Sequence, residues 1–497
     1  MSNLAGAVFA HAAEDPTRIA VRTGETAVSY GELRDLVASY AGQVVAAGVR
    51  PGDRVLLIAP TVPEFVAAYY GLHAAGAVLI TMNVMATAPE IGYVIDDAGV
   101  SLVVAWHASA TAATAAAEER GVPAWNLGPL ATLPTGGGIV APVDRADDET
   151  AIIIYTSGTT GRPKGAELGV GGIFALVEAA RERLAFDPAT DRAGTALPLF
   201  HVYGQLIVLH ISVSLGAPVS LLHPFDPSRM LAMIRDDRLT IVSGVPAMWN
   251  AMLHAPGDWS ADDFAQLRLA SSGGASLPAE SIRAFQDRFG VRIREGYGLS
   301  ETSGWATSTP HDQTPKIGSV GRAVPGMRLE VRDPSGRPVP TGEVGEVWVS
   351  GPIVMKGYWN RPEATAEAIQ DGWLRTGDLG TLDEDGDLRI VDRLKELIIR
   401  GGYNVYPREV EEVLYEHPDI VEAAVIGVAD PTYGEEVAAV VVLRPGAELG
   451  VDELRAWAKA RLSAYKVPHL VQFVPALPKG PSGKILKRAI DREQLRG

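Results

Sequence analysis

The sequence predicts an α/β protein. A large N-terminal domain of stacked α/β subdomains, with a small β-rich subdomain, precedes a small α+β C-terminal domain. Three observations support this fold class. The chain has 497 residues, whereas one hydrophobic core stops growing at roughly 250–300 residues, so at least two domains are expected. Helix-length and strand-length segments alternate over much of the chain. The pattern then changes near residue 318 and again near residue 392.

The first part of the chain is predicted to consist of βαβ units. Such alternation gives a mainly parallel sheet with helices on both faces. The expected elements are helices at 30–47, 64–75, 172–184 and 202–215, strands at 55–58, 77–80, 193–197 and 240–243, and a βα unit at 267–289. Two stacked α/β halves would account for this length.

The remainder of the chain has two further patterns. Short β-type runs at 327–332 and 345–350 are broken by Gly and Pro, which predicts a small barrel or a β-rich subdomain. The elements expected after residue 392 are helices at 407–416 and 451–462 and strands at 421–428, 437–443 and 470–473. We therefore predict an N-terminal domain of residues 1–391 and a C-terminal domain of residues 392–497, which has the size of an independent domain.

Composition and charge exclude several classes of function. Hydrophobic residues make up 47% of the chain and charged residues 21%, as in ordinary globular proteins. The net charge of −16 repels nucleic acid and anionic membranes, so neither is expected as a main partner. The sequence contains no cysteine, which excludes disulfides and thiol nucleophiles. Any thiol in the chemistry must therefore arrive with a substrate.

The sequence also bears on location. The N-terminus lacks a basic segment followed by an apolar stretch, so we expect no secretory signal and a cytoplasmic protein. Residues 65–82 are apolar, but Gly71, His73 and Gly76 interrupt them, which favours a buried helix and strand over a membrane span. We do not expect an integral membrane protein, and the sequence leaves a homodimer open.

The segment 152–165 has the composition of a loop that holds an anion. Residues 152–155 are predicted to form a buried strand. After it come hydroxyls at Thr156, Ser157, Thr159 and Thr160, glycines at Gly158, Gly161 and Gly165, and a cation at Lys164. Glycines let backbone N–H groups turn inward, hydroxyls add donors, and the lysine supplies a charge for a polyphosphate. A flexible surface turn is the alternative, but it would not need four hydroxyls beside a lysine.

This loop is not a Walker A loop, in which the lysine directly follows the second glycine, because Arg162 and Pro163 intervene here. The segment closely resembles the phosphate-binding signature of the adenylate-forming enzymes. This superfamily contains acyl-CoA synthetases, aryl-CoA ligases, firefly luciferase and peptide-synthetase adenylation domains. The resemblance covers nearly the whole chain. It implies that the protein uses ATP, Mg²⁺ and coenzyme A and that the small C-terminal domain is mobile.

A second motif, Gly-Tyr-Gly-Leu-Ser-Glu-Thr, occupies residues 296–302 and is expected just after a strand at 291–293. It departs from the dinucleotide fingerprint because Glu301 stands at the third glycine position, where a carboxylate would repel a pyrophosphate. The residues that the resemblance assigns to nucleotide binding here are Gly296, Tyr297, Gly298 and Ser300. In the family pattern the tyrosine stacks on adenine, a hydroxyl residue, more often threonine than the serine found here, contacts the α-phosphate, and the glutamate matching Glu301 holds Mg²⁺. The alternatives are that Tyr297 is a core aromatic and that Glu301 is a helix-capping acid.

Two more segments complete the predicted nucleotide site. Gly273, Gly274 and Ala275 match the adenine-binding turn of the family, where glycines let a flat base approach the backbone. Asp378 matches the aspartate that takes both ribose hydroxyls, a role that suits a carboxylate with two acceptor oxygens. An ordinary turn aspartate is the alternative.

The C-terminal domain carries the last matches. By resemblance, Arg393 binds the ribose, Lys395 is the hinge, Gly401 and Gly402 leave room for the pantetheine arm of coenzyme A, and Lys484 is the catalytic lysine. One site cannot be complementary both to adenylate formation and to thiol attack, so a rotation that exchanges catalytic faces is a physical solution. The alternatives are a solvated linker for the charged residues around Lys395 and a basic tail for the segment around Lys484.

The acyl end of the site is predicted among residues 200–205 and 244–249 and Trp305, which are mostly apolar or aromatic, although they could equally be plain core. Peptide-synthetase domains carry an aspartate where His201 stands, so an amino-acid substrate is disfavoured. Malonyl-type ligases carry an arginine where Gly296 stands, so no cation is evident for a second carboxylate. The predicted catalytic residues are Lys484, Glu301, Lys164 and His201, and the predicted metal ligands are Glu301 and Thr156.

We therefore expect an ATP-dependent acyl-CoA synthetase that forms an acyl-adenylate and then the thioester. The expected substrate is a monocarboxylic acid with an apolar body, with a medium- to long-chain fatty acid preferred over an arylpropenoic acid. An aryl- or cinnamate-type CoA ligase and an acyl-AMP ligase that loads a carrier protein stay open. A P-loop ATPase or Rossmann dehydrogenase is opposed by both motif mismatches. A binding protein without turnover is opposed by Glu301, Lys395 and Lys484.

Overall fold

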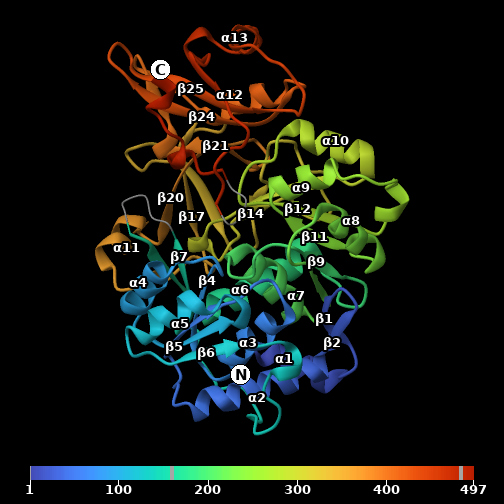
Figure 1. Ribbon diagram of the computed structural model, residues 1–497. Helices are drawn as coiled ribbons and strands as arrows, with labels where there is room; N and C mark the ends of the chain where they lie inside the picture. The colour runs from blue at the N-terminus through green and yellow to red at the C-terminus, as the bar shows by residue number, and fades with distance from the viewer. Residues whose placement is uncertain (1, 157–161, 481–484, 497) are drawn as a thin grey trace.

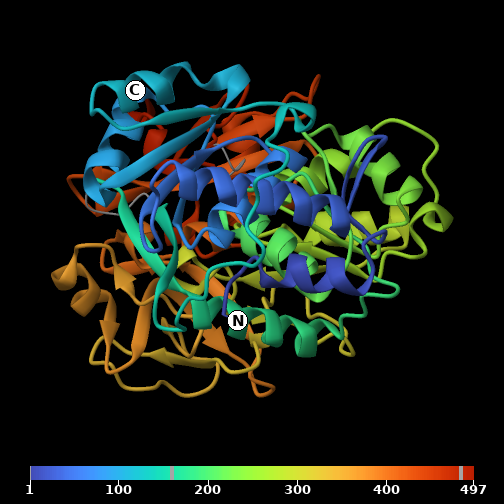
Figure 2. The ribbon, with the colours of Figure 1, turned by 90° about the horizontal axis from the view of Figure 1, so that it is seen from below.

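The structure is a computed structural model that describes residues 2–156, 162–480 and 485–496. In Figure 1 the N-terminal part of the chain forms a broad lower body, and the C-terminal elements α12 (Pro407–Tyr415), α13 (Val451–Lys459), β24 (Ile420–Asp430) and β25 (Gly434–Leu443) lie above it. The view from below in Figure 2 shows the first helices of the chain, in blue, lying across the front of this body.

The first sheet has the strand order β15-β14-β13-β12-β11-β9-β10-β1-β2. In that order its strands are Arg322–Ala323, Thr307–Ser308, Ile293–Tyr297, Leu269–Ser272, Ile241–Gly244, Ala193–Thr195, Val219–Leu221, Ile19–Thr23 and Thr26–Ser29. Strands β13 to β1 run parallel, and antiparallel strands extend both edges. Helices α8 (Pro227–Asp236), α9 (Pro246–Leu253) and α10 (Ala279–Phe289) share an apolar core with this sheet.

The second sheet has the strand order β18-β8-β7-β4-β3-β5-β6. In that order its strands are Gly357–Tyr358, Lys164–Gly169, Thr150–Thr156, Val78–Met82, Arg54–Ile58, Val100–Trp106 and Ala124–Leu127. The strands from β7 through β4, β3 and β5 to β6 run parallel. The pairings of β8 with β7 and of β18 with β8 are antiparallel. Helices α4 (Ala88–Ala98) and α5 (Thr111–Glu118) pack on it through a separate core. The prediction of stacked, mainly parallel α/β halves is confirmed.

The largest core lies around α3 (Pro63–Ala74), which contacts β1 of the first sheet and β3 and β4 of the second. Every residue of α3 except Glu64 is buried, as expected for a helix that is apolar on all sides. The other helices around this core are α1 (Gly6–Glu14), α2 (Tyr30–Ala46), α6 (Val170–Leu184) and α7 (Ile211–Leu215). Within the described parts of the chain, no helix is both long enough and apolar enough to cross a membrane.

An antiparallel β-sheet connects the large body to the C-terminal domain. Its strands are β16 (Arg328–Arg332), β17 (Gly345–Ser350), β20 (Trp373–Leu382), β19 (Ile369–Gln370) and β21 (Leu388–Arg393). Helix α11 (Pro362–Ala368) lies beside it. The C-terminal sheet consists of β22 (Ile398–Arg400), β23 (Tyr403–Val405), β24, β25 and β26 (Leu470–Phe473). The boundary predicted at 391/392 falls within β21, and it stays a prediction.

Sequence prediction and structure differ at three functional segments. The strand predicted at 291–293 is β13, Ile293–Tyr297, because pairing with β14 extends it through Gly296 and Tyr297. Lys164 does not lie in a loop but begins β8, where it pairs with Thr156. The helix predicted at 202–215 is a π-helix over Tyr203–His210 that continues as α7. A π-helix has wider turns than an α-helix. A sequence pattern with a period of 3.6 residues predicts only a helix and does not distinguish the two.

Candidate active site

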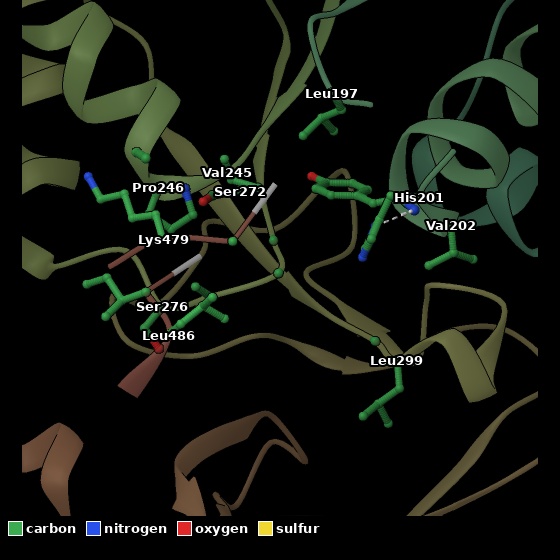
Figure 3. A pocket seen from close by; sticks show the side chains of 18 of the residues that line it. Leu197, His201, Val202, Val245, Pro246, Ser272, Ser276, Leu299, Lys479 and Leu486 are labelled. Atoms are coloured by element: carbon green, nitrogen blue, oxygen red, sulfur yellow. Dashed lines mark hydrogen bonds between the residues drawn. The ribbon is translucent and has the colours of Figure 1, made fainter. Parts of the chain in front are cut away.

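A cleft of about 2540 Å³ lies between the large body and the C-terminal domain. Thr156 and Tyr297 line it from the carboxyl ends of the parallel strands β7 and β13, the edge at which α/β sheets bind ligands. Figure 3 shows Lys479 and Leu486, from the C-terminal domain, on the side of Pro246, opposite His201 and Val202. Residues far apart in the sequence therefore share one site.

The structure brings most predicted site residues together. Those that line the cleft are Thr156, Lys164, His201, Gly273, Gly274, Ala275, Gly296, Tyr297, Gly298, Ser300, Glu301, Asp378, Arg393 and Lys395. Gly401 and Gly402 instead form the turn between β22 and β23 and are not among the described residues that line it. The predicted residues Ser157, Gly158, Thr159, Thr160, Gly161 and Lys484 lie outside the described residues.

One cluster joins Tyr297, Asp378 and Arg393. The Tyr297 hydroxyl donates to Asp378 Oδ2 over 2.6 Å, and Arg393 Nε lies 3.1 Å from Asp378 Oδ1. Asp378 and Arg393 are cross-strand partners in β20 and β21, so the sheet register sets this pair. Burial and then the Asp378 charge raise the pKa of the Tyr297 phenol well above its usual value. The cluster places an aromatic ring beside a buried carboxylate with two acceptor oxygens, groups that suit a base and a ribose.

A second cluster contains Glu301 and Lys164. The Tyr358 hydroxyl donates to Glu301 Oε1 over 2.9 Å, and Lys164 Nζ lies 5.3 Å from the centre of the Tyr358 ring. The Thr156 hydroxyl is 3.4 Å from the carbonyl oxygen of Lys164. Glu301 and Thr156 both line the cleft, their carboxylate and hydroxyl oxygens are the hard donors that Mg²⁺ prefers, and the lysine adds a charge for phosphate. The residues present therefore fit a magnesium polyphosphate.

A cluster of three carboxylates is paired with a lysine and an arginine. Asp383, Asp385 and Asp387 gather in the turn between β20 and β21. Lys316 Nζ lies 2.5, 2.7 and 2.9 Å from their carboxylate oxygens, and Arg322 also pairs with Asp387. These carboxylates are therefore held by side-chain cations and are not a reason to assign a second metal.

Glycine is required at two turns of the cleft. A Cβ at Gly298 would overlap the carbonyl oxygen of Gly304, so the motif can fold back closely only without a side chain. Gly274 has a φ of +81°, a left-handed conformation that favours glycine. Both positions agree with a backbone that must approach a flat base or a phosphate.

Charged residues fix the segment where the chain enters the C-terminal domain. Asp392 accepts hydrogen bonds from the backbone N–H groups of Arg393 (2.7 Å) and Arg408 (2.9 Å). Lys487 Nζ lies 2.7 Å from Glu411 Oε1 and 3.4 Å from Glu396 Oε2. Glu396 belongs to the short turn that also holds Lys395, a residue whose pKa is lowered by desolvation and by the Arg393 charge. The C-terminal segment is thus tied to the proposed hinge.

The acyl end of the cleft has both apolar and polar walls. Its lining includes Leu197, Val202, Val245, Pro246 and Ala247, with His201 and Tyr203 beside them. The backbone N–H of Tyr203 donates to His201 Nδ1 over 3.4 Å. The Tyr203 hydroxyl is 3.1 Å from Ser271 Oγ, which adds hydroxyl groups to an otherwise apolar wall.

Sequence reasoning missed Tyr358 and Lys487. Tyr358 lies 57 residues from Glu301, and the antiparallel pairing of β18 with β8 brings it into the cleft. The only local signal was an aromatic pair after a glycine, at 357–359. Lys487 has no role assigned from the sequence, because its salt bridge with Glu411 joins residues that are 76 positions apart.

Known proteins share this architecture and sequence. The pattern of the AMP-binding enzyme family matches residues 8–359, and that of the AMP-binding enzyme C-terminal domain matches residues 409–484. The chain is 43% identical to a feruloyl-CoA synthase of Amycolatopsis sp over 488 residues, 96% of each chain. It is 36% identical to a long-chain-fatty-acid–CoA ligase of Bacillus subtilis over 485 residues, 90% of this chain and 86% of that one. ATP-bound MatB from Rhodopseudomonas palustris has a TM-score of 0.93 at 34% identity, over 99% and 98% of the two chains.

The chain therefore belongs to the AMP-binding enzymes of the adenylate-forming superfamily, as the motifs indicated. Within this superfamily it is an ATP-dependent, AMP-forming acyl-CoA ligase that uses ATP, Mg²⁺ and coenzyme A. The predicted class of enzyme is confirmed. The predicted preference for a medium- or long-chain fatty acid is not confirmed, because a feruloyl-CoA synthase has higher identity than a fatty-acid ligase.

Proposed function

We propose that the acid activated by this ligase is an arylpropenoic acid of the ferulic type, converted to its coenzyme A thioester. The observation that carries the proposal is the 43% identity to a feruloyl-CoA synthase across 96% of both chains. The acyl compartment supports it. The Tyr203 and Ser271 hydroxyls could accept or donate hydrogen bonds to phenolic substituents of a ring, while Val202 and Pro246 offer apolar contact. This replaces the preference for fatty acids drawn from sequence.

In the first half-reaction the carboxylate of the acid attacks the α-phosphorus of ATP, and pyrophosphate leaves. We assign adenine stacking to Tyr297 and the ribose hydroxyls to Asp378 and Arg393, which are joined by short contacts. We assign the base to the turn of Gly273, Gly274 and Ala275, the α-phosphate to Ser300, and further nucleotide contacts to Gly296 and Gly298, all of which line the cleft. These contacts would orient ATP toward the acyl compartment.

The charged groups are assigned to the phosphates. Glu301 and Thr156 would hold Mg²⁺, which when bound offsets the negative charge of the phosphate oxygens. Lys164 supplies a fixed cation for the polyphosphate, and Lys484 stabilises the charge that develops between the carboxylate oxygen and the α-phosphate. His201, which lines the acyl end of the cleft, is assigned to the substrate carboxylate.

In the second half-reaction the thiol of coenzyme A loses its proton and attacks the acyl carbonyl carbon, and AMP leaves with the electrons of the broken bond. The thiol must come from the substrate because the chain has no cysteine. We propose that residues 392–497 rotate about Lys395 between the steps, bringing the turn of Gly401 and Gly402 to the cleft. The cytoplasmic location and the homodimer stay predictions.

A fatty acid is the second candidate, favoured by the 36% identity to a long-chain-fatty-acid–CoA ligase. In an apolar tunnel each buried methylene contributes roughly 0.8 kcal/mol, so kcat/KM would rise about fourfold per carbon until the tunnel ends. An aryl-acid pocket would show no such climb.

The test is a steady-state measurement of pyrophosphate release and thioester formation with ferulate, octanoate, dodecanoate and malonate. We expect ferulate to have the highest kcat/KM, at least about tenfold above either fatty acid, a difference of roughly 1.4 kcal/mol. A continuous rise from octanoate to dodecanoate above ferulate would establish the second candidate. Pyrophosphate release without thioester formation, even with coenzyme A present, would indicate delivery to a carrier protein.

A further inference from the structure

We propose that Tyr358 is a positioning residue for adenylation, which fixes the Glu301 carboxylate relative to the Lys164 side chain so that metal and polyphosphate are held together. The Tyr358 hydroxyl donates to Glu301 Oε1 over 2.9 Å, and its ring lies 5.3 Å from Lys164 Nζ. One tyrosine therefore touches both charged groups.

These charged groups come from different sheets. Glu301 follows β13 of the first sheet, whereas Lys164 begins β8 of the second. Tyr358 links the two sheets through its side chain, because its backbone belongs to the second sheet while its hydroxyl reaches the Glu301 carboxylate.

The backbone around Tyr358 is itself held at both ends. Met355 N–H donates to the Glu301 carbonyl oxygen over 2.8 Å, and Trp359 N–H donates to the Gly165 carbonyl oxygen over 2.8 Å. The residues on either side of the short strand β18 are thus hydrogen-bonded to the Glu301 motif and to the phosphate-loop strand. Tyr358 lies within it, opposite Ala166.

The backbone at Tyr358 is also restrained by helix α11. The backbone N–H of Tyr358 donates to Thr365 Oγ1 over 2.8 Å, and that hydroxyl donates to the Arg361 carbonyl oxygen over 2.8 Å. Thr365 also packs against Gly357, where a Cβ would come within 2.7 Å of its methyl group. Helix α11 therefore braces the strand, which limits the positions that the phenol can adopt.

The chemical consequence concerns one oxygen of the carboxylate. A hydrogen bond to Oε1 sets the rotation of the Glu301 carboxyl group, which fixes the direction in which Oε2 points. Partners of this kind, which contact a metal ligand rather than the metal, commonly change metal affinity by about 10- to 100-fold. The ring face attracts the lysine ammonium, which holds that cation on the same side.

The inference rests on the proposed roles of Glu301 and Lys164, so the experiment must separate the two claims. Isothermal titration calorimetry would give the Kd of the non-reactive analogue α,β-methylene-ATP with Mg²⁺ and with EDTA. The readout is the ratio of these Kd values, which isolates the contribution of the metal. The variants are Tyr358→Phe, which removes only the hydroxyl, and Glu301→Gln, which removes the ligand charge.

Tyr70→Phe is the matched control. Tyr70 is a buried core tyrosine whose hydroxyl contacts His210 Nδ1 over 3.4 Å, so this variant also loses one buried hydroxyl contact but outside the cleft. Melting temperatures of all three variants would be compared with wild type. The control should keep the wild-type ratio of Kd values.

We expect Tyr358→Phe to reduce the metal contribution at least about tenfold, with little change in the Kd measured in EDTA. A ratio within about twofold of wild type, alongside a clear loss in Glu301→Gln, would overturn the role of Tyr358 and leave the metal site standing. An unchanged ratio in Glu301→Gln would overturn both claims. An equal loss in Tyr70→Phe would mean that general loosening explains the result, and the inference would be wrong.

Discussion

Replacing Asp378 with asparagine should weaken ATP binding while leaving the fold intact. The side chain keeps its shape and can still accept the Tyr297 hydroxyl, which lies 2.6 Å from Oδ2. What is lost is the negative charge, together with the ion pair to Arg393. Because the carboxylate is proposed to take both ribose hydroxyls, two hydrogen bonds to a charged acceptor become bonds to a neutral one.

The magnitude follows from that change. Hydrogen bonds to charged groups contribute about 1.5–3 kcal/mol, against about 0.5–1.5 kcal/mol for neutral pairs, a difference of roughly 1–1.5 kcal/mol for each hydroxyl. The total of about 2–3 kcal/mol corresponds to an increase of about 30- to 150-fold in the KM for ATP. The Arg393 side chain is 37% exposed, so losing its ion pair should reduce stability by less than about 1 kcal/mol.

The assay is ATP–pyrophosphate exchange at saturating acid, with thermal unfolding measured in parallel. Asp191→Asn is the matched control, since it breaks another buried pair, in which Arg268 Nη2 lies 2.5 Å from Asp191 Oδ2, outside the cleft. The control should lose stability and keep the wild-type KM. A KM for ATP within about threefold of wild type in Asp378→Asn would refute the assignment of the ribose to this carboxylate.

Three further predictions concern the turn, the core and the hinge. Gly298→Ala places a Cβ against the Gly304 carbonyl, so we expect the free energy of unfolding to fall by about 1–3 kcal/mol. The rate of adenylation should also fall. Urea titration measures the first effect, and ATP–pyrophosphate exchange measures the second. Burial lowers the pKa of His210 to about 3, so the folded state binds fewer protons below pH 6.5. The free energy of unfolding should then fall toward acid by up to about 1.4 kcal/mol per pH unit, and urea midpoints at pH 7 and 5 should show a smaller difference in His210→Asn. Lys395→Pro restricts φ at the proposed hinge and should slow thioester formation while sparing adenylation, and stopped-flow assays showing equal losses would contradict the hinge.

Much of the fold could be predicted because its signals are local. The segments 345–350 and 470–473 are strands with the predicted bounds. The strand predicted at 152–155 lies within β7. Apolar runs and turn residues determine the structure of segments only a few residues long, so a sequence pattern can predict those segments directly. The nucleotide motifs were predicted for the same reason, since each depends on short runs such as 296–302.

The rest depends on pairing between distant segments. β13 extends through Tyr297 because Thr307 and Ser308 return to pair with it, and nothing near residue 293 indicates this. Tyr358 reaches Glu301 only through the pairing of β18 with β8, so its role has no local signature. Sequence patterns cannot show contacts of this kind.

The most direct test of the two-step account is a single-turnover measurement of both half-reactions in Lys484→Ala. Adenylation develops charge beside the α-phosphate that a positioned lysine stabilises, whereas attack by a thiol on a finished adenylate does not need that cation. We predict that the variant forms acyl-adenylate from acid and ATP about 10²- to 10³-fold more slowly, yet converts supplied feruloyl-adenylate and coenzyme A to the thioester at close to the wild-type rate. Equal losses in both half-reactions would contradict the assignment of Lys484 to adenylation and the alternation of the C-terminal domain between the two steps.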